Sequence, residues 1–167
     1  MSRFILLLFF ISTCLLVDCS DSTSPQPAEP TLLLTFTGTE ERLEVNTVAN
    51  QYMSEYGYCC EGRVMPFDIH TDDDPRLCGR RTHIDSMYAQ DDGTFRITGT
   101  FSLVNDGGTW TGTLEGALDL SGVHVDLKGY GQGNYQGLYF EMTSYVEGDP
   151  TTPTGTGWFE GSLYQLH

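Results

Sequence analysis

Apolar and polar residues alternate along the chain from Thr94 to Leu138, and short glycine-containing stretches interrupt the alternation. A period of two places the apolar side chains on one face of a pleated sheet. The interruptions at 105–108 and 121–122 are short turns, so the strands on either side of each are antiparallel neighbours. The residues on the shared parity are Phe95, Ile97, Gly99, Phe101, Leu103, Trp110, Gly112, Leu114, Gly116, Leu118, Val123, Val125 and Leu127. This segment predicts a β-meander.

The same reading extends the sheet over most of the remaining chain. Strands are expected at 31–37, 64–70, 80–88, 94–104, 109–120, 123–130, 135–146 and 157–164. Residues 40–62 have mixed periodicity and predict either a short strand near 43–48 or a helical turn near 48–56. A meander of about eight strands removes its exposed edges most simply by closing, with the first strand paired to the last. The sequence therefore predicts an all-β fold, a single antiparallel up-and-down barrel.

The first 19 residues are expected to be a signal peptide rather than part of the fold. The apolar run from Phe4 to Val17 is shorter than the roughly 20 residues of a membrane-spanning helix. It ends at Cys19, and a Ser/Pro-rich stretch follows, which resembles a bacterial lipoprotein signal with Cys19 as the lipidated residue. Asp18 departs from that pattern, so an ordinary secretory signal cut nearby is the alternative. Either reading predicts an exported protein, with a flexible tether at 20–30 and a β-barrel domain at 31–167.

The chain carries a formal charge of −15. Such a surface repels nucleic acid and anionic headgroups, so nucleic-acid binding is excluded as a main role, and a membrane is reached only through the lipid anchor. The basic residues Arg76, Arg80 and Arg81 lie beside the acidic run 72–74, where they either neutralise these carboxylates or form an anion-binding patch. No motif indicates a cofactor.

Three cysteines fall within the expected barrel domain: Cys59, Cys60 and Cys78. Because an exported protein usually forms disulfides, we expect Cys78 to pair with Cys60 or with Cys59, leaving one free thiol. No CxxC motif is present, so a structural metal is not expected.

Glycine and aromatic motifs of the last 70 residues carry a family resemblance. The segments GTWTGTLEGAL (108–118), GYGQGNYQGLYFEM (129–142) and GTGWFEGSL (155–163) resemble exported bacterial small β-barrel proteins of mostly unknown function. They are also similar to the barrels of the allene oxide cyclase and dirigent type. The resemblance covers roughly residues 94–165 and implies a barrel, whose interior in the cyclase-type relatives holds a hydrophobic substrate. No catalytic residue of those families matches a position here.

Histidines and carboxylates alternate on two expected strands. Asp68, His70 and Asp72 share one parity, and His83 and Asp85 follow on the next strand. If the two strands are neighbours, His70 could approach His83 in a two-histidine metal site. Exposed polar strand faces explain the same pattern more simply, and we favour that explanation.

The expected interior contains large aromatic residues and one acid. Parity places Glu115 and Glu141 outside, and Glu160 inside with Trp158. An acid buried among apolar groups has a raised pKa and can act in acid–base catalysis. The candidates for lining a ligand cavity are Phe95, Phe101, Trp110, Phe140, Trp158 and Glu160. In a barrel of about eight strands such residues fill the core more often than they line a cavity.

These features predict a non-catalytic binding or structural module of the cell envelope, anchored by lipid at Cys19. The alternatives are an isomerase or cyclase of the allene oxide cyclase type and a lipocalin-like carrier of a small apolar ligand. The volume and polarity of the barrel interior distinguish the three.

Overall fold

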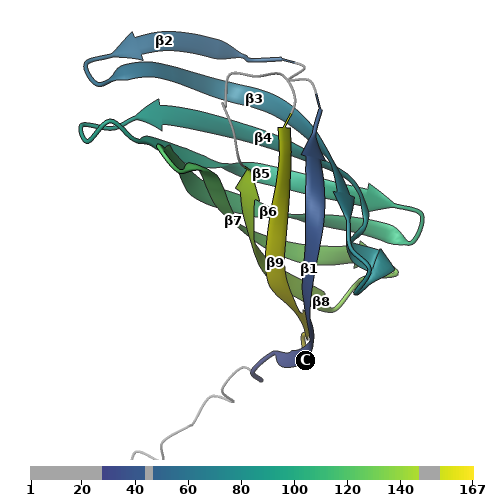
Figure 1. Ribbon diagram of the computed structural model, residues 1–167. Helices are drawn as coiled ribbons and strands as arrows, with labels where there is room; N and C mark the ends of the chain where they lie inside the picture. The colour runs from purple at the N-terminus through teal and green to yellow at the C-terminus, as the bar shows by residue number, and fades with distance from the viewer. Residues whose placement is uncertain (1–27, 44–46, 147–154) are drawn as a thin grey trace, which may run out of the picture.

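The computed structural model describes residues 28–43, 47–146 and 155–167, and this part of the chain is all-β (Figure 1). The strands are β1 (Thr31–Arg42), β2 (Asn50–Ser54), β3 (Gly57–His70), β4 (Gly79–Ala89), β5 (Phe95–Asn105), β6 (Gly108–Asp119), β7 (Gly122–Gly133), β8 (Leu138–Val146) and β9 (Gly155–Gln165). A single 3-10 turn, η1 (Pro75–Leu77), lies between β3 and β4.

The strands form one antiparallel sheet that closes into an up-and-down barrel. Its order is β1-β9-β8-β7-β6-β5-β4-β3-β2, and β1 also pairs with β3. The expected pairing of the first and last strands is confirmed by the long β1–β9 ladder. Closure is completed by a short ladder in which Thr39 of β1 faces His70 of β3 and Arg42 faces Phe67. Eight strands therefore form the ring, and β2 lies outside it.

The region of mixed periodicity contains β2 and the first half of β3. A tight turn at Glu55 and Tyr56 joins them, and Ser54 faces Gly57 across the hairpin. The alternative of a helical turn near 48–56 is wrong, because residues 50–54 are extended and pair with β3. β3 starts at Gly57 and not near Val64, because a bulge between Cys60 and Arg63 interrupts its alternation and hides the strand in the sequence.

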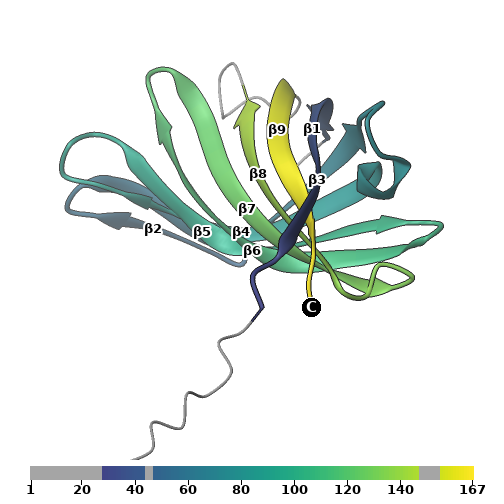
Figure 2. The ribbon, with the colours of Figure 1, turned by 90° about the horizontal axis from the view of Figure 1, so that it is seen from below.

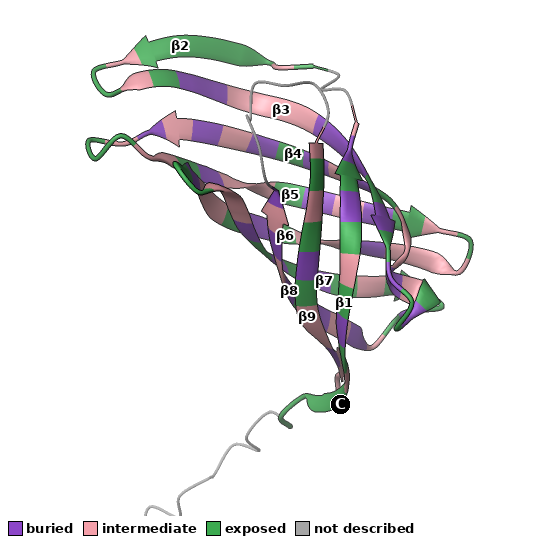
Figure 3. Ribbon diagram, in the orientation of Figure 1, coloured by how far each residue is buried: buried purple, intermediate pink, exposed green. Residues whose placement is uncertain are grey.

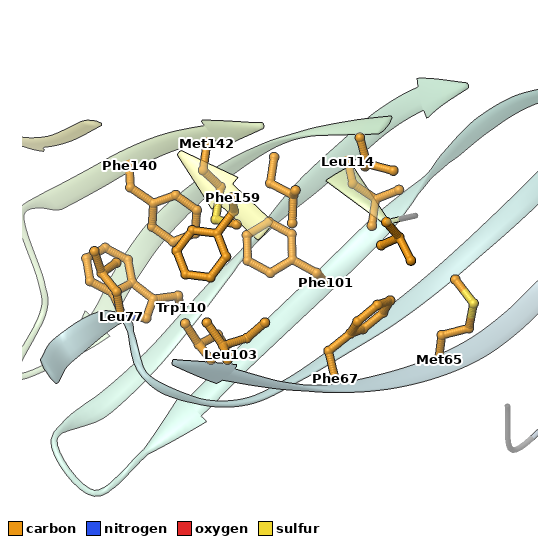
Figure 4. Packing of buried hydrophobic residues seen from close by; sticks show 14 of the residues in the cluster. Met65, Phe67, Leu77, Phe101, Leu103, Trp110, Leu114, Phe140, Met142 and Phe159 are labelled. Carbon is orange, nitrogen blue, oxygen red and sulfur yellow. The ribbon is translucent and has the colours of Figure 1, made fainter. Parts of the chain in front are cut away.

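Glycines on the inner face make room for aromatic rings. Phe101 faces Gly112, Gly112 faces Gly129, and Gly129 faces Phe140 across four neighbouring strands. A Cβ atom on Gly129 would lie 2.5 Å from the ring of Phe140. Because the two glycines carry no side chain, the rings of Phe101 and Phe140 meet over them with centroids 5.8 Å apart. The close view shows these rings at the centre of the core (Figure 4).

The end of the barrel near η1 is closed. η1 brings Leu77 into the core beside Trp110 (Figure 4). The indole Nε1 of Trp110 donates a 2.8 Å hydrogen bond to the carbonyl of Arg76, and its ring stacks on Tyr135. Asp74 caps η1 by accepting a 2.9 Å hydrogen bond from the backbone N–H of Arg76. These contacts cover one mouth of the barrel, so access from this side is blocked.

Candidate functional site

Four of the predicted cavity residues lie on the inner face. Phe101, Trp110 and Phe140 are buried in the core, and Phe95 packs against it while partly buried. Trp110 has an exposed fraction of 0% and contacts the ring of Phe140 at a centroid distance of 5.1 Å. These rings pack against one another, so they fill the interior.

The predicted inward positions of Trp158 and Glu160 are wrong. Trp158 is 43% exposed and stacks on Tyr145 of β8 on the outer wall. Glu160 is exposed and borders a surface hollow of about 480 Å³ with Asp73 and Thr37. The inward residue is Phe159, whose ring lies over Gly38 of β1 at a position where a Cβ would approach within 2.2 Å. The glycines of β1 and β9 therefore fix which aromatic residue of β9 turns inward.

A buried ion pair crosses the interior between β1 and β4. The Oε2 atom of Glu40 lies 2.5 Å from Nη2 of Arg81, and each side chain is 1% exposed. Ser144 of β8 donates a 2.7 Å hydrogen bond to the other carboxylate oxygen of Glu40. The guanidinium of Arg81 lies 4.9 Å from the ring centre of Phe67, a cation–π contact. Both charges are thus held by fixed partners within the apolar core.

A second ion pair, between a partly buried arginine and a buried aspartate, lies further along β4. Nε of Arg63 on β3 donates a 2.9 Å hydrogen bond to Oδ1 of Asp85. Burial raises the pKa of Asp85, and the nearby Arg63 opposes that rise. The Oδ2 atom of Asp85 is buried and has no hydrogen-bond partner among the described residues. Half of this carboxylate is therefore unsatisfied.

His83 lies between the two pairs on the inner face of β4. Its ring contacts Phe67 at a centroid distance of 4.6 Å, and its buried Nε2 has no partner among the described residues. Burial lowers the pKa of His83 well below its ordinary value, and the charges of Arg81 and Arg63 lower it further. His83 is therefore neutral at physiological pH.

Very little free space is left inside the barrel. One internal cavity has a volume of about 30 Å³, enough for about one or two water molecules. It lies towards the end opposite η1, and its walls are mostly apolar. The lining residues are Arg42, Arg63, Met65, Phe67, Met87, Ile97, Leu118, Val123 and Val146. Neither His83 nor Asp85 is among the residues that line it.

The two histidines of the proposed metal site do not come together. His70 is on the outer face at the end of β3 and is exposed, whereas His83 points inward and faces Met65 across the β3–β4 ladder. Within the described residues, no group of three or more His, Cys, Asp or Glu side chains could hold a metal ion.

The three neighbouring arginines expected to neutralise the acidic run or to bind an anion point in different directions. Arg76 pairs with Asp74, Arg80 pairs with Asp68 at 2.8 Å on the outer surface, and Arg81 points into the core. Each of these arginines has its own carboxylate partner. The cluster does not form an anion-binding patch.

The predicted disulfide between Cys78 and Cys60 or Cys59 is not formed. All three thiols are free. Cys60 faces Met87 at one end of the β3–β4 ladder, and Cys78 directly precedes Gly79, which faces Ile69 at the other end. The nine-residue step along β3 corresponds to roughly 30 Å, whereas bridged cysteines have Cα atoms about 4.4–6.8 Å apart.

Cys19 and the signal segment lie outside the described residues. No helix among the residues that the structure describes is both long and apolar enough to cross a membrane. Comparison of the chain with protein-family models, with curated proteins and with solved structures finds no match.

Sequence reasoning missed the buried charges. Arg81, His83 and Asp85 alternate on β4 with Thr82, Ile84 and Ser86. Ile84, on the outward parity, is exposed, so hydrophobicity gives no clear inner face for this strand. The polar residues alone would have been assigned to the outside.

Proposed function

We propose that the protein is an exported, lipid-anchored β-barrel that acts as a non-catalytic binding module of the cell envelope and binds through its outer surface. The observation that supports this proposal is the filled interior. The internal cavity of about 30 Å³ is at least tenfold smaller than ligand pockets, which measure roughly 300–1,000 Å³.

The two alternatives need space that the interior lacks. A lipocalin-like carrier requires an open apolar cavity, and a cyclase-like enzyme requires a substrate beside an acid or base. Here Trp110, Phe140 and Phe159 occupy the central volume, and the acids Glu40 and Asp85 are bound to arginines. Glu160, the acid expected inside, lies on the outer wall.

The anchor is proposed from the sequence and agrees with the position of β1. Residues 20–30 separate Cys19 from β1, whose first residue, Thr31, pairs with Gln165 near the η1 end. Eleven residues span at most about 40 Å, so an anchored barrel would stay close to the membrane with its η1 end nearest to it.

Two measurements test the proposal. Native mass spectrometry of the protein purified from its own envelope fraction should give the mass of the mature chain plus lipid, with no second small molecule bound. An apolar molecule that stays bound to the protein at one per chain after washing with lipid-free buffer would contradict a filled interior. Labelled fatty acid should attach to the wild-type chain and not to Cys19→Ser, and an unlabelled wild-type chain would refute the anchor.

A further inference from the structure

Among the described residues, one side of β2 is unpaired along the whole length of the strand. It pairs with β3 alone, whereas each of the eight ring strands has two neighbours. Both ribbon views show β2 at the periphery of the molecule, beyond the closed ring (Figures 1 and 2). The backbone N–H and C=O groups along this side of residues 50–54, here called the β2 edge, can pair with another extended chain.

The β2 edge lacks the features that normally prevent pairing. Edge strands are commonly protected by charged side chains or proline. β2 reads Asn-Gln-Tyr-Met-Ser and contains neither, although the whole chain carries a formal charge of −15. Almost all of β2 is exposed (Figure 3).

Apolar side chains flank the β2 edge on both faces of the hairpin. Met53 is 73% exposed and faces Tyr58 across the β2–β3 ladder. Tyr52 points to the opposite face, where its hydroxyl lies 3.5 Å from Glu61. A chain added beside β2 would therefore find an apolar neighbour for its side chains on each face.

Aromatic residues on the outer surface away from the β2–β3 hairpin pack against one another. Tyr130 packs on Tyr139, Tyr139 packs on Tyr164, and Tyr145 stacks on Trp158. These are cross-strand pairs of the kind that stabilise a sheet. These residues belong to strands that have a neighbour on each side, whereas β2 has a neighbour on one side alone. The β2 edge is therefore the stronger candidate for an interaction.

We propose that the β2 edge binds an extended segment of a partner polypeptide by strand addition. Main-chain hydrogen bonds would supply affinity, and contacts with Met53 on one face and Tyr52 on the other would favour apolar side chains in the added strand. This inference rests on the proposed binding function and names its partner. The partner segment carries net positive charge, because the chain is strongly acidic and Glu55 and Glu61 lie at the two ends of the β2–β3 hairpin.

A second copy of the chain fits the β2 edge less well. Two copies would bring together bodies with a formal charge of −15 each. Stable interfaces bury about 1,200–2,000 Å², more than a five-residue strand pair provides. A basic peptide avoids the charge repulsion, and it need not form the large interface of a stable dimer.

The experiment uses the full mature chain and a synthetic nine-residue peptide that alternates valine and threonine between terminal lysines. Amide hydrogen exchange measures protection at residues 50–54, and fluorescence anisotropy of the labelled peptide gives its affinity. Peptide binding should slow exchange within residues 50–54 at least tenfold. The variant Met53→Lys should weaken binding at least tenfold by adding a positive charge beside the edge. The control Leu120→Lys adds the same charge at an exposed position in the β6–β7 turn and should stay within twofold of wild type.

Three results would overturn the inference. The first is unchanged exchange of these amides at millimolar peptide. The second is equal loss of binding in both lysine variants, which would indicate a general charge effect. The third is a wild-type dimer whose β2 amides are protected without peptide, which would make a second copy the occupant. None of these outcomes alters the volume of the interior, so the inference can fail while a filled barrel is retained.

Discussion

Glu40 and Arg81 form an ion pair inside the barrel although their strands, β1 and β4, are not neighbours. β3 lies between those strands, and the two side chains reach past it to a separation of 2.5 Å. The β1–β3 ladder that completes the ring spans only Thr39–Arg42 and Phe67–His70. The ion pair therefore connects β1 to β4 beside the shortest ladder of the ring.

Removing one member of this pair should be costly. Glu40→Met leaves the Arg81 charge buried without a carboxylate, and we expect a loss of about 3–5 kcal/mol in the free energy of unfolding. The double variant Glu40→Met/Arg81→Met should lose less than the sum of the two single variants, because neither charge is then left alone. Urea denaturation gives the free energy of unfolding of the wild type, Glu40→Met, Arg81→Met and the double variant. Additive losses would show that the two side chains are not energetically coupled.

Much of the fold could be predicted from the sequence, because in several strands one set of alternate residues is mostly apolar and the other is mostly polar. In β5 and β6 the inward residues are apolar or glycine, and the outward residues are polar apart from Val104 and Ala117, so the prediction that Trp110 faces inward is confirmed. In β9 the adjacent residues Trp158 and Phe159 are both aromatic, and alternation cannot separate them. The distinguishing signal is glycine: Gly157 and Gly161 share the parity of Phe159, as Gly112 shares that of Trp110.

The two aromatic residues of β9 should differ sharply in their effect on stability. Phe159→Ala removes a buried ring that contacts Phe36, and we expect a loss of about 3–5 kcal/mol. Trp158→Ala removes an exposed ring whose main neighbour is Tyr145, so the loss should be about 1 kcal/mol. Chemical denaturation of the two variants compares them directly. A larger loss for Trp158→Ala would mean that β9 faces the other way.

The polar interior could not be predicted because its residues are far apart in the chain. The partners Glu40 and Arg81 are 41 positions apart, and Ser144 is 104 positions from Glu40. Each residue alone is typical of an exposed strand face. Only barrel closure brings them together, and the position of β3 between β1 and β4 depends on a ladder of four residue pairs.

Buried His83 should make the fold sensitive to acid. Because burial, Arg81 and Arg63 lower its pKa, the unfolded chain takes up a proton below about pH 6.5 and the folded protein does not. The free energy of unfolding should therefore fall as pH falls, by up to about 1.4 kcal/mol per pH unit from this group. The raised pKa of Asp85 acts in the opposite direction, at pH values just above the ordinary value of 3.8 for that carboxyl.

The variant His83→Met separates this contribution from the others. From pH 7 to pH 5 the wild type should lose stability relative to His83→Met, by at most about 2 kcal/mol, measured by urea denaturation at each pH. Exposed His70 provides the control, and His70→Gln should run parallel to the wild type. Parallel curves for His83→Met as well would show that His83 can be protonated in the folded state.

The cysteines of the barrel should react as thiols. Because Cys60 and Cys78 lie at opposite ends of the β3–β4 ladder, we expect Cys59, Cys60 and Cys78 all to be alkylated after unfolding without a reducing agent. In the native protein the buried Cys59 and Cys60 should react more slowly than partly exposed Cys78. Mass spectrometry counts the modified residues. A pair of these cysteines that is alkylated only after reduction would contradict the placement of these strands.

The proposed binding takes place on the outer surface of a barrel whose interior is filled. Labelled methionine methyl groups report on the interior and on the outer surface. Met65 and Met87 line the internal cavity, and Met142 lies in the core. Met53 lies on the exposed hairpin. Titration with a saturated sixteen-carbon fatty acid, followed by methyl NMR, should leave the signals of Met65, Met87 and Met142 unchanged. Saturable shifts of those three methyl groups would show a ligand inside the barrel and would contradict a filled interior.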